Sequence, residues 1–178
     1  MSKAFASPVS SPGETVNLKD PIVAAILAWL VPGLGHLYQG RTGKGLLYLI
    51  SILTIFCYGL YLSDGRAVYA SWVDEDKRLP YLCQIGVGLP ALPALVQAYL
   101  VRHGKPPLAG GIEAPPIDMA ELNEWYKTLN RYFELGTVYT MIAGLLNILA
   151  IYDAWGGPMP VEVVSSKKRP TEPAPSGG

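Results

Sequence analysis

Four long stretches of the chain contain no Asp, Glu, Lys or Arg, and they dominate its pattern of apolar and polar positions. They cover residues 21–40, 45–63, 80–101 and 135–152. Each approaches the roughly 20 residues that a helix needs to cross about 30 Å of hydrocarbon. Aromatic residues fall near the ends of these stretches, where their rings favour the headgroup region. The pattern predicts an all-α integral membrane protein with about four transmembrane helices: a first hairpin over residues 21–63, then helices over residues 80–101 and 135–155.

The first of these stretches is interrupted. Its continuous apolar run over residues 22–31 ends at Pro32 and Gly33. A run of that length also suits a re-entrant segment, which enters a membrane and returns to the same face, or an interfacial segment. Apolar character continues past the break through Leu34 and Tyr38, so we expect a kinked span, with a re-entrant or an interfacial segment as the alternative.

Residues from about 117 to 133 follow a helical rhythm of a different kind. Apolar and aromatic side chains recur there at spacings of three and four, at Leu122, Trp125, Tyr126, Leu129, Tyr132 and Phe133. Charged and amide side chains fill most positions between them, which predicts an amphipathic surface helix with Asp118 as its N-cap. Its aromatic face suits the membrane surface, the ends of the other helices or a partner protein, and these alternatives stay open.

The composition agrees with a membrane domain between two tails. Half of the residues are hydrophobic and 16% are charged, against about 25% charged in an average soluble domain. Residues 1–20 and 156–178 are rich in Pro, Ser and Gly, so we expect flexible tails on either side of a single transmembrane helical domain over residues 21–155. The sequence before the first apolar run lacks the basic start of a signal peptide, and this run is expected to remain as an uncleaved anchor.

Residues 32–45, PGLGHLYQGRTGKG, combine five glycines with two basic residues, as phosphate-binding loops do. The spacing excludes that role. A P-loop would require glycine in place of Tyr38 and Ser or Thr in place of Gly45, and the dinucleotide fingerprint also requires glycine in place of Tyr38. We therefore expect no nucleotide ligand. The glycines are interpreted as a helix break and a tight turn, with Arg41 and Lys44 among lipid headgroups.

Small residues repeat along the predicted helices and indicate where their backbones approach each other. The candidate helix-packing positions are Gly33, Gly35, Gly86, Ala94, Gly136 and Gly144.

Polar residues in or beside the apolar stretches are the other candidate positions, because an ionisable group at membrane depth is a functional hypothesis. They are His36, Arg41, Lys44, Asn147 and Asp153. Each also has a structural interpretation. His36 would bond carbonyl groups of the glycine-rich turn, Asn147 would bond across helices, and Asp153 would pair with a basic residue or face water.

No catalytic, metal-binding or cofactor site is predicted. The chain has two histidines, and Cys57 and Cys83 are isolated in sequence. Both cysteines are expected near one membrane face, either as free thiols or as a disulfide. We expect a non-enzymatic accessory or scaffold subunit. The alternative is a small transporter or channel subunit with a polar path near His36, Asn147 and Asp153, and an enzyme acting on lipid comes third.

The hairpin segment carries a resemblance. Residues 32–62 have a first helix ending in glycines, an aromatic residue at Tyr38, a short turn and an immediate second helix, with Asp64 just beyond. In these features the segment resembles the two-helix hairpin of the TM-two domain superfamily and related small bacterial membrane families of unknown function. The superfamily's Asp-Arg-Phe-like triplet is missing. The resemblance implies a multi-pass protein of the bacterial cytoplasmic membrane and no particular reaction.

The partners expected from all this are the lipid bilayer together with other membrane proteins or further copies of the chain, and no nucleic acid. Orientation stays open. With four spans, eight Lys and Arg residues would lie on the face of the tails and six on the other face, which is too small a difference to orient the chain.

Overall fold

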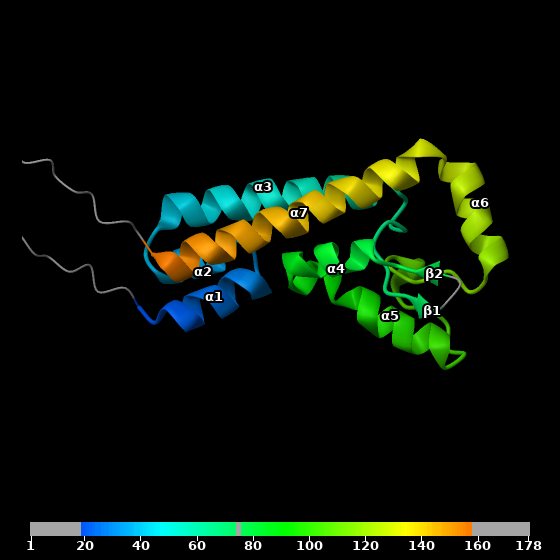
Figure 1. Ribbon diagram of the computed structural model, residues 1–178, viewed down its shortest axis with the longest axis horizontal. Helices are drawn as coiled ribbons and strands as arrows, with labels where there is room; N and C mark the ends of the chain where they lie inside the picture. The colour runs from blue at the N-terminus through cyan, green and yellow to red at the C-terminus, as the bar shows by residue number, and fades with distance from the viewer. Residues whose placement is uncertain (1–18, 74–75, 158–178) are drawn as a thin grey trace, which may run out of the picture.

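The computed structural model describes residues 19–73 and 76–157 (Figure 1). The two predicted tails, residues 1–20 and 156–178, lie almost entirely outside these described residues. The described part is mostly helical, as the sequence predicts.

Two long helices form the central part of the fold. Helix α3 spans Thr42–Leu62 and helix α7 spans Arg131–Gly156, and they lie side by side in opposite directions (Figure 1). At about 1.5 Å per residue they are about 32 and 39 Å long. In the part of the chain that the structure describes, these are the two helices long and apolar enough to cross a membrane. Four were predicted, and that number is not confirmed.

The first apolar stretch forms two short helices that fold back on each other. Helix α1 spans Pro21–Leu30, with the Asp20 side chain accepting a hydrogen bond from Ile22 N at 2.9 Å. Helix α2 spans Leu34–Tyr38 and leads directly into α3. The chain reverses at Gly33, whose φ of +81° is a left-handed conformation that glycine adopts without strain. Figure 1 shows that α1 starts, and α2 ends, at the same end of the molecule.

The third apolar stretch is also broken. It forms α4 (Pro80–Gln84), the 3₁₀ turns η1 (Ile85–Val87) and η2 (Leu89–Ala91), and α5 (Pro93–Arg102). Gly88, between the two 3₁₀ turns, has φ +84° and ψ −133°, and the prolines after it remove backbone donors that a continuous helix would need. The segment enters from the end opposite to α1 and returns there (Figure 1). The predicted continuous helix over residues 80–101 is therefore wrong, and the first and third apolar stretches form two opposed hairpins.

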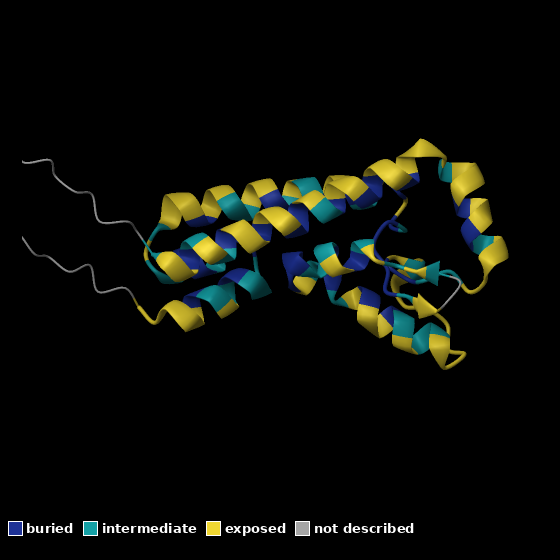
Figure 2. Ribbon diagram, viewed as in Figure 1, coloured by how far each residue is buried: buried dark blue, intermediate teal, exposed yellow. Residues whose placement is uncertain are grey.

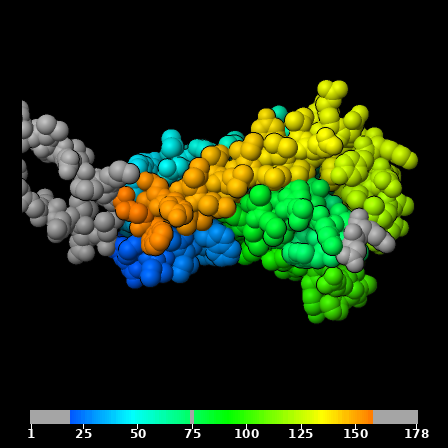
Figure 3. All heavy atoms as spheres, in the orientation of Figure 1, coloured from blue at the N-terminus to red at the C-terminus, as the bar shows by residue number. Residues whose placement is uncertain are grey.

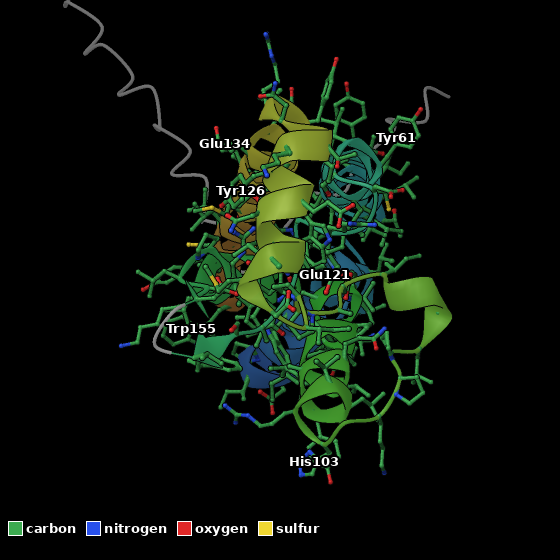
Figure 4. The ribbon with its side chains drawn as sticks, turned by 90° about the vertical axis from the view of Figure 1, so that its right-hand side faces the viewer. Tyr61, His103, Glu121, Tyr126, Glu134 and Trp155 are labelled. Carbon is green, nitrogen blue, oxygen red and sulfur yellow. The ribbon has the colours of Figure 1, made fainter. Side chains whose placement is uncertain are left out.

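The remaining elements close the end of the molecule from which α4 and α5 enter. They are the two-stranded antiparallel ribbon β1 (Trp72–Val73) and β2 (Asp76–Lys77), the 3₁₀ turn η3 (Ala109–Gly111) and helix α6 (Met119–Leu129). Figure 4 looks at this end: α6 runs across it with Glu121 and Tyr126, while His103 marks the far end of α5.

Helix α6 confirms the predicted amphipathic helix, although it is shorter than expected. The Asp118 side chain caps it by accepting from Glu121 N at 2.8 Å. It stops at Asn130, whose φ of +48° redirects the chain into α7. Its apolar face buries Leu122 and Trp125 against the rest of the protein. Among the alternatives left open by the sequence, this helix covers its own fold.

The outer surfaces of α3 and α7 are largely exposed (Figure 2), and most of the side chains on them are apolar. Only 22% of the apolar window of α3 and 39% of that of α7 are buried. A core helix of a water-soluble protein would be mostly buried. The exposed side chains include Leu46, Leu47, Ile50, Leu145, Ile148 and Leu149. A continuous exposed apolar surface of this kind needs a partner or a lipid environment.

Candidate functional site

Polar side chains follow the buried side of α7 from one end to the other. They are Thr137, Thr140, Asn147 and Asp153, and over these 16 residues the helix advances by about 24 Å. Each of them contacts a different segment of the fold. Thr137 and Thr140 belong to one part of this polar line, and Asn147 and Asp153 each belong to another, so the line has three separate parts.

The first part lies at the end where α3 begins. Three basic side chains converge on one oxygen of Asp153, Oδ2: His36 Nε2 at 2.8 Å, an Arg41 guanidinium nitrogen at 3.1 Å and Lys44 Nζ at 3.3 Å. Arg41 also donates to the Asp153 backbone carbonyl at 3.3 Å, and Gln39 donates to Ala154 O at 2.6 Å. Cations at a helix C-terminus are favourable because they face its free carbonyl groups. These contacts bind the α2–α3 turn to the end of α7.

This cluster differs from the arrangement expected for four full spans. In a bundle of four full spans, Arg41 and Asp153 would lie at opposite ends. In the structure they are in contact, because α1 and α2 together cross only part of the fold and return. His36 is completely buried, and its second nitrogen, Nδ1, has no hydrogen-bond partner in the described part of the chain.

The second part is the meeting point of the two hairpins beside α7. Asn147 Nδ2 donates to Ala28 O at 3.1 Å and to Gly86 O at 2.9 Å. The first carbonyl belongs to α1 and the second to η1, so one amide group bridges both hairpins. Figure 3 shows the same meeting on the surface, where the blue N-terminal segment adjoins the green one below α7.

The two hairpin tips are also in direct contact with each other. Trp29 Nε1 donates to Ile85 O at 3.3 Å. A Cβ atom added to Gly88 would overlap the Trp29 carbonyl oxygen, so only glycine fits this contact. Asn147 supplies donors to carbonyls near helix breaks, which the interrupted backbone would otherwise leave unpaired. Its own acceptor, Oδ1, is buried without a partner among the described residues.

The third part lies toward α6. Gln84 Nε2 donates to Ala67 O at 3.0 Å and to Thr140 Oγ1 at 2.9 Å. Arg78 donates to the same Ala67 carbonyl at 3.0 Å and to Thr137 Oγ1 at 2.8 Å. Arg78 was not among the predicted positions, because it lies in a connector without a periodic pattern.

Two aromatic rings hold the Arg78 guanidinium, Tyr69 at 4.5 Å and Phe133 at 5.0 Å from the ring centres. Desolvation by burial raises the pKa of Tyr69, which keeps its hydroxyl neutral as a donor to Asp76 Oδ1 at 3.2 Å. This part fastens the connector over residues 63–79 to α7.

A separate polar group that sequence reasoning missed lies beside α5. Glu113 is only 3% exposed and has φ +60°, an uncommon conformation for a residue other than glycine. It lines an apolar groove between α5 and the connector before α6. An isolated acidic residue in a turn-rich connector carries no periodic signal that would have predicted this position.

The predicted packing positions are where backbones approach. A Cβ atom on Gly33, Gly35, Gly86, Gly136 or Gly144 would come too close to a backbone carbonyl oxygen of another segment, and Ala94 is fully buried. Cys57 and Cys83 are both free thiols. In the described ranges, no three His, Cys, Asp or Glu side chains gather as they would to hold a metal ion.

The predicted polar positions do not form one site. His36, Arg41, Lys44 and Asp153 come together, whereas Asn147 lies six residues, or about 9 Å, from Asp153 toward the N-terminus of α7. The first group fastens the start of α3, and the second fastens the two hairpin tips.

Comparison with known proteins gives one match. No curated protein and no solved structure matches the chain. A family model does match, over residues 23–168, which include every described helix except the first two residues of α1. This confirms the expectation of a family without an assigned function, although the match shows no link to the TM-two superfamily. The chain belongs to the family of unknown function DUF6677.

Proposed function

We propose that this chain is a multi-pass protein of the bacterial cytoplasmic membrane in which only α3 and α7 cross the bilayer. The hairpins α1–α2 and α4–α5 enter from opposite faces and turn back near the middle. The exposed apolar surfaces of α3 and α7 support the placement in lipid, because such surfaces would be unfavourable in water. Bacterial origin follows from the resemblance of the first hairpin alone.

The hairpin tips support this placement as well. Non-helical backbone at membrane depth is tolerated only where protein or enclosed water satisfies its polar groups. Asn147 does this for Ala28 and Gly86 from inside the protein. A soluble protein would not need one buried amide for two interrupted helices, since water can reach most helix ends.

Within the membrane, we propose a non-enzymatic role as a scaffold or accessory subunit. The observation that carries this proposal is that both hydrogen bonds donated by the Asn147 amide join the two hairpin tips. Gln84, Arg78 and Arg41 likewise donate to backbone carbonyls. Polar groups used in this way rigidify a fold, and such a rigid unit suits the positioning of partner proteins.

A transporter or channel subunit is the second candidate. Broken helices that meet at mid-depth are a recurring arrangement in transporters. Three buried atoms along the polar line lack a hydrogen-bond partner among the described residues: His36 Nδ1, Gln84 Oε1 and Asn147 Oδ1. Water molecules bonded to these atoms in another conformation would extend a path through the protein.

Labelling of single cysteines tests the membrane placement. In a background with Cys57→Ala and Cys83→Ala, one cysteine replaces Thr42 and another replaces Thr128. Two spans place these positions on opposite faces, whereas four spans would place them on the same face. Labelling by a membrane-impermeant maleimide from one side should therefore modify one position and spare the other. Modification of both from the same side would contradict the two-span topology.

Flux measurements separate the two roles. Purified protein in liposomes loaded with a pH-sensitive dye should pass protons and small ions no faster than empty liposomes. If the unchanged protein raises the flux above that background and Asn147→Leu does not, the scaffold role is contradicted and transport is supported.

A further inference from the structure

An apolar groove runs along α5, outside the polar line of α7. Its volume is about 510 Å³, within the range of about 300–1,000 Å³ that ligand pockets occupy. One wall is formed by Leu89, Leu92, Pro93 and Val96, and the other by Leu108, Ala109 and Ile112. Two residues give it polar character, Gln97 and Glu113.

The wall formed by residues 108–113 is held in place by hydrogen bonds. The Gln97 side chain accepts from Leu108 N at 2.8 Å and donates to Leu108 O at 2.8 Å and Ile112 O at 3.0 Å. Glu113 N donates to Gly65 O at 2.8 Å. The groove is thus formed before anything enters it, which reduces the entropy cost of binding.

Glu113 is unusual for a buried acidic residue. Its carboxylate accepts one hydrogen bond from the backbone of Ala94, in the first turn of α5. The other oxygen, Oε2, is buried and has no partner in the described ranges, where no basic side chain is ion-paired with Glu113. Burial raises the pKa of this carboxyl to about 7. A buried carboxylate without a counter-ion is costly, and a bound cation would remove that cost.

The groove opens sideways from the protein. Leu89 follows directly after Gly88, at the tip of the hairpin, and the groove extends from there toward the connector that carries Glu113. Leu89 is 46% exposed and Val96 is 52% exposed. With the hairpin placed in the membrane as proposed above, the apolar part faces hydrocarbon and Glu113 lies nearer the headgroups.

We propose that this groove binds an amphiphile with one hydrocarbon chain and a primary ammonium head, which donates a hydrogen bond to Glu113 Oε2. The chain lies along Leu89, Leu92 and Val96. An ammonium supplies both the missing charge and the missing donor, whereas an alcohol supplies only the donor and a fatty acid repels the carboxylate. A phospholipid amine would bring its phosphate next to Glu113, so a single-chain amine fits better. The site rests on the proposed membrane placement for its access and on Glu113 for its chemistry.

Titration of the full-length protein in dodecyl maltoside tests the site. Dodecylamine, dodecanol and dodecanoic acid carry the same chain on different heads, and calorimetry gives the apparent Kd of each at pH 8. We expect saturable dodecylamine binding, with dodecanol at least about tenfold weaker and dodecanoic acid weaker again, because a charge-assisted hydrogen bond is about this much stronger than a neutral one.

Three variants assign the binding to the groove. Glu113→Gln should weaken dodecylamine at least about tenfold and leave dodecanol within about threefold, because it removes the charge and keeps the shape. Val96→Trp should weaken both probes, since an exposed position on the groove wall accepts the larger ring without core disruption. Glu124→Gln removes an equal charge from the exposed face of α6 and should change neither Kd.

Equal dodecylamine binding by Glu113→Gln and the unchanged protein would overturn the proposal, as would dodecanoic acid binding as tightly as dodecylamine. Absence of saturable binding to the unchanged protein would also overturn it. The cysteine labelling described above needs no ligand, so failure of the amine site and failure of the two-span topology give different results.

Discussion

Replacement of Asn147 tests whether one side chain holds the two hairpin tips together. Asn147→Leu keeps the number and branching of the side-chain heavy atoms and removes both amide donors, so the carbonyls of Ala28 and Gly86 lose these donors. Side-chain hydrogen bonds within membrane proteins average about 0.6 kcal/mol and reach about 1.7 kcal/mol. Two such bonds give a loss of about 1–3 kcal/mol in the free energy of unfolding. The contact is buried on all sides, so this loss should lie in the upper half of the range.

The assay is reversible unfolding by sodium dodecyl sulfate in mixed micelles, followed by circular dichroism. With Trp72, Trp125 and Trp155 replaced by Phe in every variant, Trp29 gives a local signal, because its indole donates to Ile85 across the tip contact. We expect its emission to change in Asn147→Leu before global unfolding. Asn123→Leu, on the exposed face of α6, is the matched control and should stay within about 0.5 kcal/mol of the unchanged protein. If Asn147→Leu also stays within that range and Trp29 emission is unaltered, Asn147 does not hold the tips.

Three further substitutions test the other contacts. Gly88→Ala should destabilise the protein by about 2 kcal/mol or more in the same unfolding assay, because it adds a clash with the Trp29 carbonyl to backbone strain. Gly104 has a φ of +66° and open space around it, so the control variant Gly104→Ala should show the backbone strain alone. The pKa of Glu113 is about 7 in the folded protein against 4.5 unfolded, so the native state binds the proton more tightly. The stability that this group contributes is complete below pH 4.5 and falls by about 3 kcal/mol as the pH rises through 7. Glu113→Gln should abolish that fall in unfolding curves taken from pH 4 to 8. Asp153→Asn should lower the free energy of unfolding by about 1 kcal/mol and increase maleimide labelling of a cysteine at position 42, since the neutral amide holds Arg41 and Lys44 less strongly. Unchanged labelling would contradict the role of the cluster in fixing that turn.

Charge-free windows predict the two long helices well and the two hairpins poorly. The windows at residues 45–63 and 135–152 correspond to α3 and α7, since absence of charge over a helical length is all that a spanning helix requires. The windows at 21–40 and 80–101 are just as free of charge, yet each reverses at a glycine with positive φ. Apolar content does not distinguish a span from two half-length segments. The reversal is decided by the tip contact, which involves residues far apart in sequence.

For the site residues too, the sequence indicates which side chains are polar in apolar surroundings but not which of them are in contact. His36, Arg41, Lys44, Asn147 and Asp153 are recognisable as polar groups in apolar surroundings. Their pairing was not predictable, because the expected four-span order separates Arg41 from Asp153. Nothing in the spacing of the connectors distinguishes Glu113 or Arg78 from exposed charges. Their burial depends on how the connectors pack against α5 and α7.

The bridge made by Asn147 also sets the order in which the fold can be completed during synthesis. Both hairpins emerge from the ribosome before residue 147, so under the proposed membrane placement each would wait in the membrane with its tip carbonyls still lacking the amide donors. Helix α7, the last of the described helices, then supplies the group that fastens α1 to the middle of the chain, across 119 residues. Among the described elements, assembly therefore ends with α7, and a chain that stops before residue 147 would lack the donor that joins the two hairpin tips.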